Sequence, residues 1–228
     1  GIDARYPRHT PYPGVTAFYR ELQGGGTVGQ LVALSARPHV VGTVVEESVM
    51  KKFANLRSQH GLHCMPALLT GAVDTGAKFF FSGGNEDGMI ALGMKKFENI
   101  VDFIRLYPEF RLVFVGDNGQ ADFAVGQMIC KRFPQHVEQV WIHEVQPREK
   151  TFHYDVHSTE KHPVDFFDDY VDAAVQAATR RQPLITPDGL HRVVTAAVSD
   201  FRGIQNWASE ENRVRELERL SKSVEVAR

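Results

Sequence analysis

The sequence has little of what marks several classes of protein. Its 228 residues include only two cysteines, Cys64 and Cys130, which lie far apart and match no metal-binding or redox spacing. So few thiols are typical of a reducing compartment, and we expect a cytoplasmic protein. No apolar run reaches the ~18 residues of a membrane span, and the N-terminal residues do not resemble a signal peptide.

The chain also lacks an excess of positive charge. Its formal net charge is −2, so it has none of the basic footprint that is typical of nucleic-acid binding, and we expect no nucleic-acid partner. With 43% hydrophobic and 24% charged residues, the composition is that of an ordinary globular protein. The length suits one α/β domain with an extension, or two small domains. Nothing in the sequence indicates an oligomeric state.

The first two thirds of the chain alternate between two kinds of segment. Short apolar runs bounded by turn residues predict buried strands, and apolar residues three or four positions apart predict helices. The predicted strands are 31–36, one or both of 65–71 and 78–81, 111–116 and 137–145; the predicted helices are 15–23, 44–59, 89–107 and 122–132. Strands and helices in this order predict a doubly wound, parallel, Rossmann-like α/β sheet.

The character of the chain changes after Pro147. A polar, histidine-rich stretch precedes three predicted helices at 164–181, 187–207 and 209–222, with no predicted strand among them. We therefore expect a core domain over 1–147 and a helical C-terminal extension over 148–228. The stretch 150–162 is typical of a solvated linker. Because it becomes mildly basic when its histidines are protonated, transient peripheral contact with an anionic membrane surface is the alternative.

Two acids follow the predicted strand 111–116. Asp117 stands where the strand ends, and Asp122 opens the next predicted helix, while Gly116 and Gly119 allow close backbone approach. Ligands gather at the carboxyl ends of parallel strands, and Mg²⁺ prefers one or two carboxylates together with water and phosphate. The pattern therefore predicts a Mg²⁺ site. The alternative is that Asp117 shapes the turn and Asp122 caps the helix.

Two further polar residues are expected at the same end of the sheet. Ser35 ends the predicted strand 31–36, so its hydroxyl and the N–H of Ala36 would face the crevice. Lys96 lies in the helix that precedes the Asp117 strand, and that helix returns antiparallel to it. Individually, Ser35 could be a satisfied hydroxyl and Lys96 a solvated charge. Together with the two carboxylates, they predict a phosphate site that contains a metal.

These residues resemble a known family. Ser35, Lys96 and the "GDNGQAD" segment match the second, third and fourth motifs of the haloacid dehalogenase superfamily. The stretch 96–122 is similar to the catalytic domain of the actin-patch phosphatidate phosphatases, and "LSARP" resembles a segment of the related lipin phosphatases. The positions that match the phosphatidate phosphatase pattern are Lys96, Ile100, Tyr107, Pro108, Gly116, Asp117, Gly119 and Asp122.

The resemblance implies a reaction and a role for each residue. Members of the superfamily transfer a phosphoryl group to an aspartate and then hydrolyse the aspartyl-phosphate. Ser35 and Ala36 would bind the phosphoryl oxygens, and Lys96 would neutralise their charge. Asp117 would bind Mg²⁺, and Asp122 would help to fix the metal site. The expected substrate is a phosphate ester, namely phosphatidate.

One motif of the superfamily is missing from the sequence. The nucleophile and the general acid come from an Asp-x-Asp after the first strand, and the only early acid here is Asp3, with no strand before it. We expect either a fragment whose first strand lies upstream of Gly1 or a natural inactive relative. In both cases this chain holds no nucleophile.

A different class of function is also open. A Rossmann-like module could bind a phosphate-bearing ligand or a protein without turnover. The segment "HGLHC" (60–64) offers only three candidate ligands, with no second cluster of fitting spacing, so we expect no zinc site there.

Overall fold

The computed structural model describes residues 3–26, 30–38, 44–71, 86–155 and 163–228. These residues form two compact units, and each is described by itself. The sheet unit comprises Val32–Lys51 and Pro66–Phe166. The helical unit comprises Gly1–Leu31, Lys52–Met65 and Phe167–Arg228.

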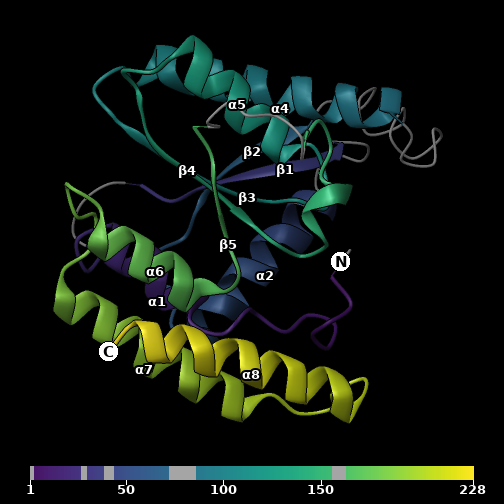
Figure 1. Ribbon diagram of the computed structural model, residues 1–228. Coiled ribbons are helices and arrows are strands. Elements are labelled where there is room, and N and C mark those ends of the chain that lie inside the picture. Colours follow the sequence, from purple (N-terminus) through teal and green to yellow (C-terminus); the bar gives the residue numbers. More distant parts are fainter. Residues whose placement is uncertain (1–2, 27–29, 39–43, 72–85, 156–162) are drawn as a thin grey trace. The chain divides into compact units, whose positions relative to one another are not determined.

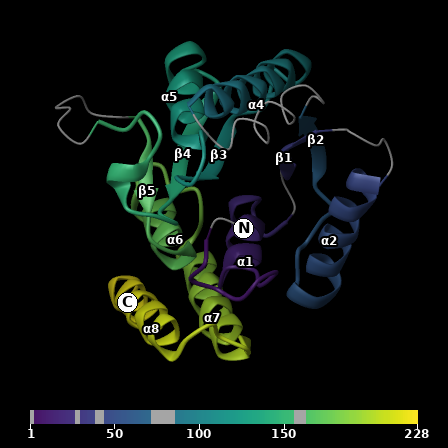
Figure 2. The same cartoon turned by 90° about the vertical axis from the view of Figure 1, so that its right-hand side faces the viewer.

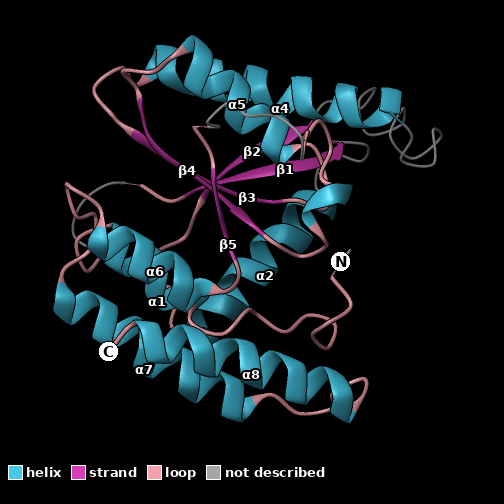
Figure 3. Ribbon diagram, viewed as in Figure 1, coloured by secondary structure: helices cyan, strands magenta, loops and turns pink. Residues whose placement is uncertain are grey.

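The sheet unit has a mixed α/β architecture with two small sheets. Strands β1 (Val32–Pro38) and β2 (Ala67–Gly71) pair in parallel in the first sheet. In the second, β3 (Leu112–Asp117) pairs in parallel with β4 (Val137–His143), and β5 (Asp165–Phe167) follows β4. The strands drawn in magenta in Figure 3 belong to these two sheets.

Two helices cover one face of the strands in the sheet unit, as Figures 1 and 2 show from two directions. They are α4 (Glu86–Leu106) and α5 (Asp122–Arg132). Their apolar faces pack on β3 and β4 in one core, because strands buried on the helix side need an apolar cover. The fully buried members of that core are Phe123, Val125, Ile129, Val140 and Ile142.

The helical unit contains α1 (Val15–Leu22), α6 (Tyr170–Thr179), α7 (Pro187–Gly203) and α8 (Glu210–Val226). The last three begin at a side-chain cap: Asp169, Thr186 and Ser209 each accept hydrogen bonds from the first-turn N–H groups. Helix α2 (Val44–His60) starts in the sheet unit and ends in the helical unit. A short 3-10 helix, η1 (Arg148–Lys150), completes the elements.

The predicted helices and strands up to residue 145 agree with these elements to within a few residues wherever the structure describes them. The predicted strand 78–81 lies outside the described residues, as do 156–162 of the polar stretch 150–162. Parallel strands on an α/β plan are confirmed, in two small sheets. The boundary after residue 147 stays a prediction.

Two predictions of local structure were wrong. The segment 164–181 was predicted to be one helix, but β5 occupies Asp165–Phe167 and α6 begins only after Asp169. Pairing with β4 favours the extended Phe-Phe segment, and the side chain of Asp169 fixes the helix start. Strand β1 also continues beyond Ser35 to Pro38, with an irregular register between Leu34 and Pro38.

None of the helices in the described part of the chain is both long and apolar enough to cross a bilayer.

Candidate functional site

A buried ion pair joins the two helices of the sheet unit. The Lys96 ammonium, on α4, donates a hydrogen bond to Oδ1 of Asp122, the first residue of α5. Lys96 is only 8% exposed and Asp122 7%. Removing both charges from water is costly, and only a paired arrangement makes that cost tolerable. The helix that leads toward β3 thus delivers its lysine to the carboxyl end of that strand, as predicted.

The same carboxylate holds the turn that follows β3. Its Oδ2 accepts a hydrogen bond from the backbone N–H of Asp117 at 3.3 Å. The side chain of Asp117 in turn accepts one from the N–H of Gly119 at 2.9 Å. A Cβ on Gly116 would lie 2.5 Å from the Cβ of Asp122, so only glycine allows this approach. The Lys96–Asp122 ion pair therefore lies against the backbone of Asp117 at the end of one strand.

Asn118 is a member of the site that the sequence did not reveal. It is 0% exposed, and its Oδ1 accepts hydrogen bonds from the N–H groups of Val145 (3.0 Å) and Gln146 (3.1 Å). Its Nδ2 donates to the Gln146 carbonyl at 2.7 Å and to the Thr151 hydroxyl at 3.1 Å. The Asn-Gly pair had the pattern of a turn, which gives no sign that the amide is a buried link between two loops.

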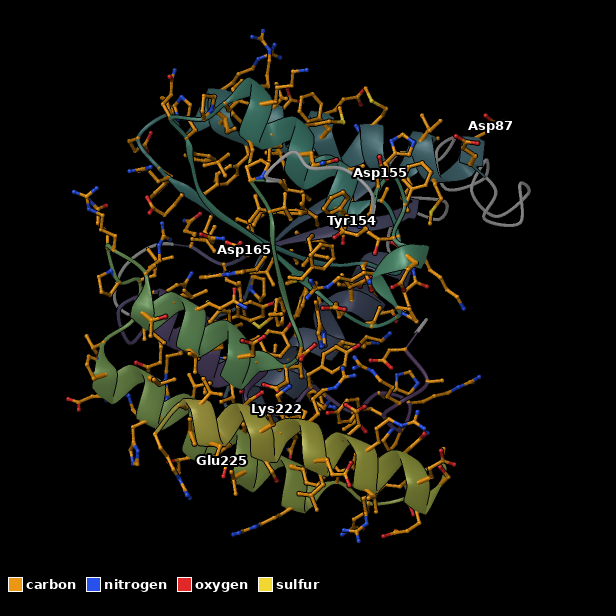
Figure 4. All side chains as sticks on the ribbon, viewed as in Figure 1. Asp87, Tyr154, Asp155, Asp165, Lys222 and Glu225 are labelled. Carbon is orange, nitrogen blue, oxygen red and sulfur yellow. The ribbon has the colours of Figure 1, made fainter. Side chains whose placement is uncertain are left out.

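Aromatic packing supports this end of the sheet unit from the segment after η1. The Tyr154 ring meets Phe123 of α5 edge-on at 5.3 Å and Phe166 of β5 at 5.4 Å. Figure 4 labels Tyr154 beside Asp155 on this segment. Because Phe123 directly follows Asp122, these rings fix the first turn of α5 and with it the carboxylate.

The predicted phosphate-binding residues lie on a different strand. Ser35 and Ala36 belong to β1, which contacts α4, the helix that carries Lys96. Their side chains are outside the described part of the structure, and the predicted role of Ser35 stays a prediction. Because β1 runs on to Pro38, neither residue is the last of its strand.

The donor set suits a hard cation. Asp117 and Asp122 offer carboxylate oxygens, the ligands that Mg²⁺ takes from proteins, usually one or two at a time. Asp122 bonds to Lys96 and to the amide of Asp117, and the Asp117 carboxylate accepts from the Gly119 N–H, so each carboxylate also has a partner within the protein. No group of three histidine, cysteine, aspartate or glutamate side chains that could hold a metal occurs within the described ranges.

Asp3 belongs to the helical unit, where its carboxylate is hydrogen-bonded. Its carboxylate accepts bidentate hydrogen bonds from the Arg5 guanidinium at 2.8–3.1 Å and one from the Tyr12 hydroxyl at 2.9 Å. Burial raises the pKa of Asp3, but the bonds from Arg5 outweigh it and hold that pKa below its usual value. A carboxylate clamped in this way has a structural role in the helical unit.

One family model matches the sequence: the catalytic domain of phosphatidate phosphatase APP1, over residues 4–144. The match spans more than half of the chain and includes Ser35, Lys96, Asp117 and Asp122. The chain belongs to this APP1 catalytic-domain family. The predicted resemblance to phosphatidate phosphatases is thereby confirmed. No curated protein and no solved structure matches the chain significantly.

Membership in the APP1 family gives the site its chemical context. The family is that of a phosphatase whose substrate is a lipid phosphate ester, so hydrolase chemistry and lipid metabolism follow from the match. The matched region ends at residue 144, just after β4.

Proposed function

We propose that this chain holds the APP1-type part of a Mg²⁺-dependent phosphatase that hydrolyses phosphatidate to diacylglycerol and phosphate. The observation that carries the proposal is the buried pair of Lys96 and Asp122 beside Asp117, at the carboxyl end of β3. A buried ammonium at the end of a strand would stabilise the negative charge of a phosphoryl group that binds there.

Each residue then has a distinct task. Asp117 would hold Mg²⁺, which supplies charge neutralisation to the phosphoryl oxygens when bound. Asp122 orients the Asp117 backbone and positions the Lys96 ammonium. An ammonium has three N–H donors, and one bond to Asp122 leaves its charge able to attract phosphoryl oxygens as well. Ser35 and the N–H of Ala36 would bind phosphoryl oxygens from β1.

We further propose that the nucleophilic aspartate and its partner acid come from a segment outside these 228 residues. The sequence holds no strand followed by Asp-x-Asp, and Asp3 is bonded to Arg5 and Tyr12. Strand β3 stands at the edge of the order β3-β4-β5, and β1 pairs with β2 in a separate sheet. A further strand beside β3 would complete a doubly wound, haloacid dehalogenase-like sheet and bring the nucleophile to Lys96.

Phosphatidate is a membrane lipid, so the proposed reaction needs contact with a bilayer surface. The stretch 150–162 is the proposed contact, because it becomes mildly basic when its histidines are protonated and would then favour the anionic head group. The contact would be peripheral and transient, in a cytoplasmic protein.

The test measures phosphate release from phosphatidate and from a soluble phosphomonoester, with Mg²⁺ or with a chelator. Both this chain and a version extended upstream are assayed. We expect Mg²⁺-dependent release only by the extended version, and its loss in Asp117→Asn. The control is Asp102→Asn, which removes an exposed carboxylate on α4 and should leave the rate unchanged.

Two results would decide against the proposal. Full activity of Asp117→Asn would remove the metal role of Asp117. If neither version released phosphate from any ester tested and inorganic phosphate still bound measurably, the result would favour the phosphate-binding module instead.

A further inference from the structure

A groove runs along the seam between α7 and α8 in the helical unit. After a short loop α8 runs back alongside α7, as Figures 1 and 2 show, and both helices contact α6. On the side away from α6, the described residues leave two hollows, of about 760 Å³ and about 680 Å³. Both hollows are lined by Val198, Arg202, Val224 and Arg228, so they form one continuous groove. Every residue that lines it belongs to the helical unit.

Apolar side chains from both helices form the walls of the groove. On α7, Leu190, Val194 and Val198 are spaced four residues apart and lie along one side of the helix. On α8, Leu217 and Val224 form the opposite wall. An open apolar surface of this kind marks an interaction site, because its burial against a partner is favourable.

The pattern on α8 is that of a helix that packs on a further helix. Val214, Leu217, Ser221 and Val224 alternate in steps of three and four residues, the spacing of a packing seam between helices. Val214 and Leu217 are each 40% exposed, so the described residues cover only part of this stripe. A helix laid along the groove would cover the rest.

The charged residues beside the apolar stripes have opposite signs on the two helices. On α8, Glu211, Glu218 and Glu225 recur every seven residues and therefore share one flank of the helix. On α7, the charged residue that lines the groove is Arg202, and the exposed His191 lines it three turns earlier. The face thus has an acidic flank on α8 and a cationic group on α7.

We propose that a second copy of this chain docks on the groove with its own α7 and α8, and that the two copies form an isologous dimer with a four-helix core. A two-fold axis parallel to the helices places α7 of each copy opposite α8 of the other, in antiparallel orientation. The apolar stripes then face each other. Arg202 of each copy meets the acidic flank of the other copy at Glu218.

Two features favour a second copy over an anionic bilayer as the occupant. The charges that line the groove nearly cancel, with three cations and two anions: Arg202, Lys222, Arg228, Glu218 and Glu225. Attraction to anionic lipids needs a clear cationic excess, whereas a face that carries both signs can be complementary to itself. The surface is also hollowed between two helices, which is the shape that receives the ridge of another helix.

The experiment is sedimentation equilibrium of the intact chain between about 1 and 100 μM, with circular dichroism to confirm that each variant is folded. We expect the average mass to rise with concentration from 25.6 kDa toward twice that value. Leu217→Arg places an unpaired charge in the interface twice, once from each copy, and should raise the dissociation constant at least about 100-fold. The matched control is Val226→Arg, on the same helix and 67% exposed but outside the lining of the groove, which should leave it unchanged.

A pair of charge reversals tests the predicted contact between copies. Arg202→Glu and Glu218→Arg should each weaken self-association, because like charges then oppose each other at both symmetry-related contacts. An equimolar mixture of the two variants should associate again, since opposite charges meet at both contacts of the mixed dimer. A pairing of Arg202 and Glu218 within one chain would not give this recovery. If Leu217→Arg failed to fold, the charge reversals would decide.

A mass of 25.6 kDa at every concentration would overturn the proposal. So would equal dissociation constants for Leu217→Arg and Val226→Arg, or a mixture of the charge-reversed variants that stays monomeric. Binding of a monomeric chain to phosphatidylserine vesicles, lost in Leu217→Arg, would identify a bilayer as the occupant and would equally overturn it.

Discussion

Two buried carboxylates with cationic partners invite comparison. In the sheet unit, Asp122 meets the Lys96 ammonium, and the whole pair is buried. In the helical unit, Glu21 of α1 meets Arg192 of α7 through two parallel bonds, Nε to Oε1 at 3.0 Å and NH2 to Oε2 at 2.7 Å. Glu21 is 5% exposed, but the Arg192 side chain is 48% exposed.

The two cations differ in whether they can still bind a second anion. A guanidinium fork fixes the direction of its carboxylate, so the Arg192 pair ties two helices together. An ammonium is a compact point charge whose remaining donors can turn toward another anion. Hydrogen bonds from Arg192 hold the pKa of Glu21 below its usual value, as suits a permanent structural pair. We therefore assign the first pair to chemistry and the second to stability.

Lys96→Met should give the largest effect on the rate of phosphate release. It tests most directly whether the buried pair in the sheet unit serves chemistry. It keeps the length of the side chain and removes its charge, so the rate of phosphate release from phosphatidate by the active extended version should fall by at least about 100-fold. The matched control is Lys95→Met, because Lys95 pairs with the exposed Glu98 on the same helix. Similar losses for both lysines would mean that the charge acts at a distance and not within the site.

Gly116→Ala should reduce the same rate by roughly tenfold. Its Cβ would press on the Asp122 carboxylate, which must shift and carry Lys96 with it. Gly203→Ala, where a Cβ meets nothing within 4 Å, should leave the rate unchanged. A rate for Gly116→Ala equal to that of the unaltered protein would show that the turn tolerates displacement of Asp122.

Glu21→Gln should lower the stability of the fold and leave the catalytic rate unchanged. Loss of the bidentate pair with Arg192 should lower the melting temperature by about 4 °C, followed by circular dichroism, with kcat unchanged. Glu211→Gln, which removes an exposed pair with Arg215, should lower it much less. A change in kcat without a change in melting temperature would reverse the assignment of the two pairs.

The smallest effect concerns pH. Burial raises the pKa of Asp169 to about 6, against hydrogen bonds from the Asp172 N–H and the Ser223 hydroxyl that lower it. The folded chain therefore binds more protons than the unfolded chain between about pH 4 and pH 6. In that window this group makes the free energy of unfolding fall as pH rises, by roughly 1–2 kcal/mol.

Asp169→Asn removes that titration and keeps a side-chain oxygen at the cap. The difference in free energy of unfolding between variant and unaltered chain, from urea denaturation at pH 4, 5, 6 and 7, should grow in favour of the variant as pH rises to 6. A constant difference would show that Asp169 titrates normally in the folded chain.

Local patterns were sufficient for much of the fold and for the position of Lys96 in the site. Strand β3 and helices α4 and α5 follow from apolar spacing, and the same spacing brings Lys96 to the carboxyl end of β3. The contact between Lys96 and Asp122 needs only an antiparallel helix beside a strand, which short connections enforce.

The rest depends on partners far away in the sequence. Strand β5 exists because Asp165–Phe167 pairs with β4, and no local pattern shows that pairing. Nothing in the local sequence marks Asn118 as a buried link, because its hydrogen bonds reach residues 145–151. The irregular register of β1 near Ser35 likewise depends on β2.

The amide of Asn118 has a consequence for how the site can evolve. It ties the Asp117 turn to residues 145–151, which lie beyond the matched region. A substitution at Gln146 or Thr151 would change the hydrogen bonds of Asn118, the neighbour of Asp117, without touching the aspartate. Selection for a different head group or a different rate could therefore work through this remote segment and leave the charged residues intact.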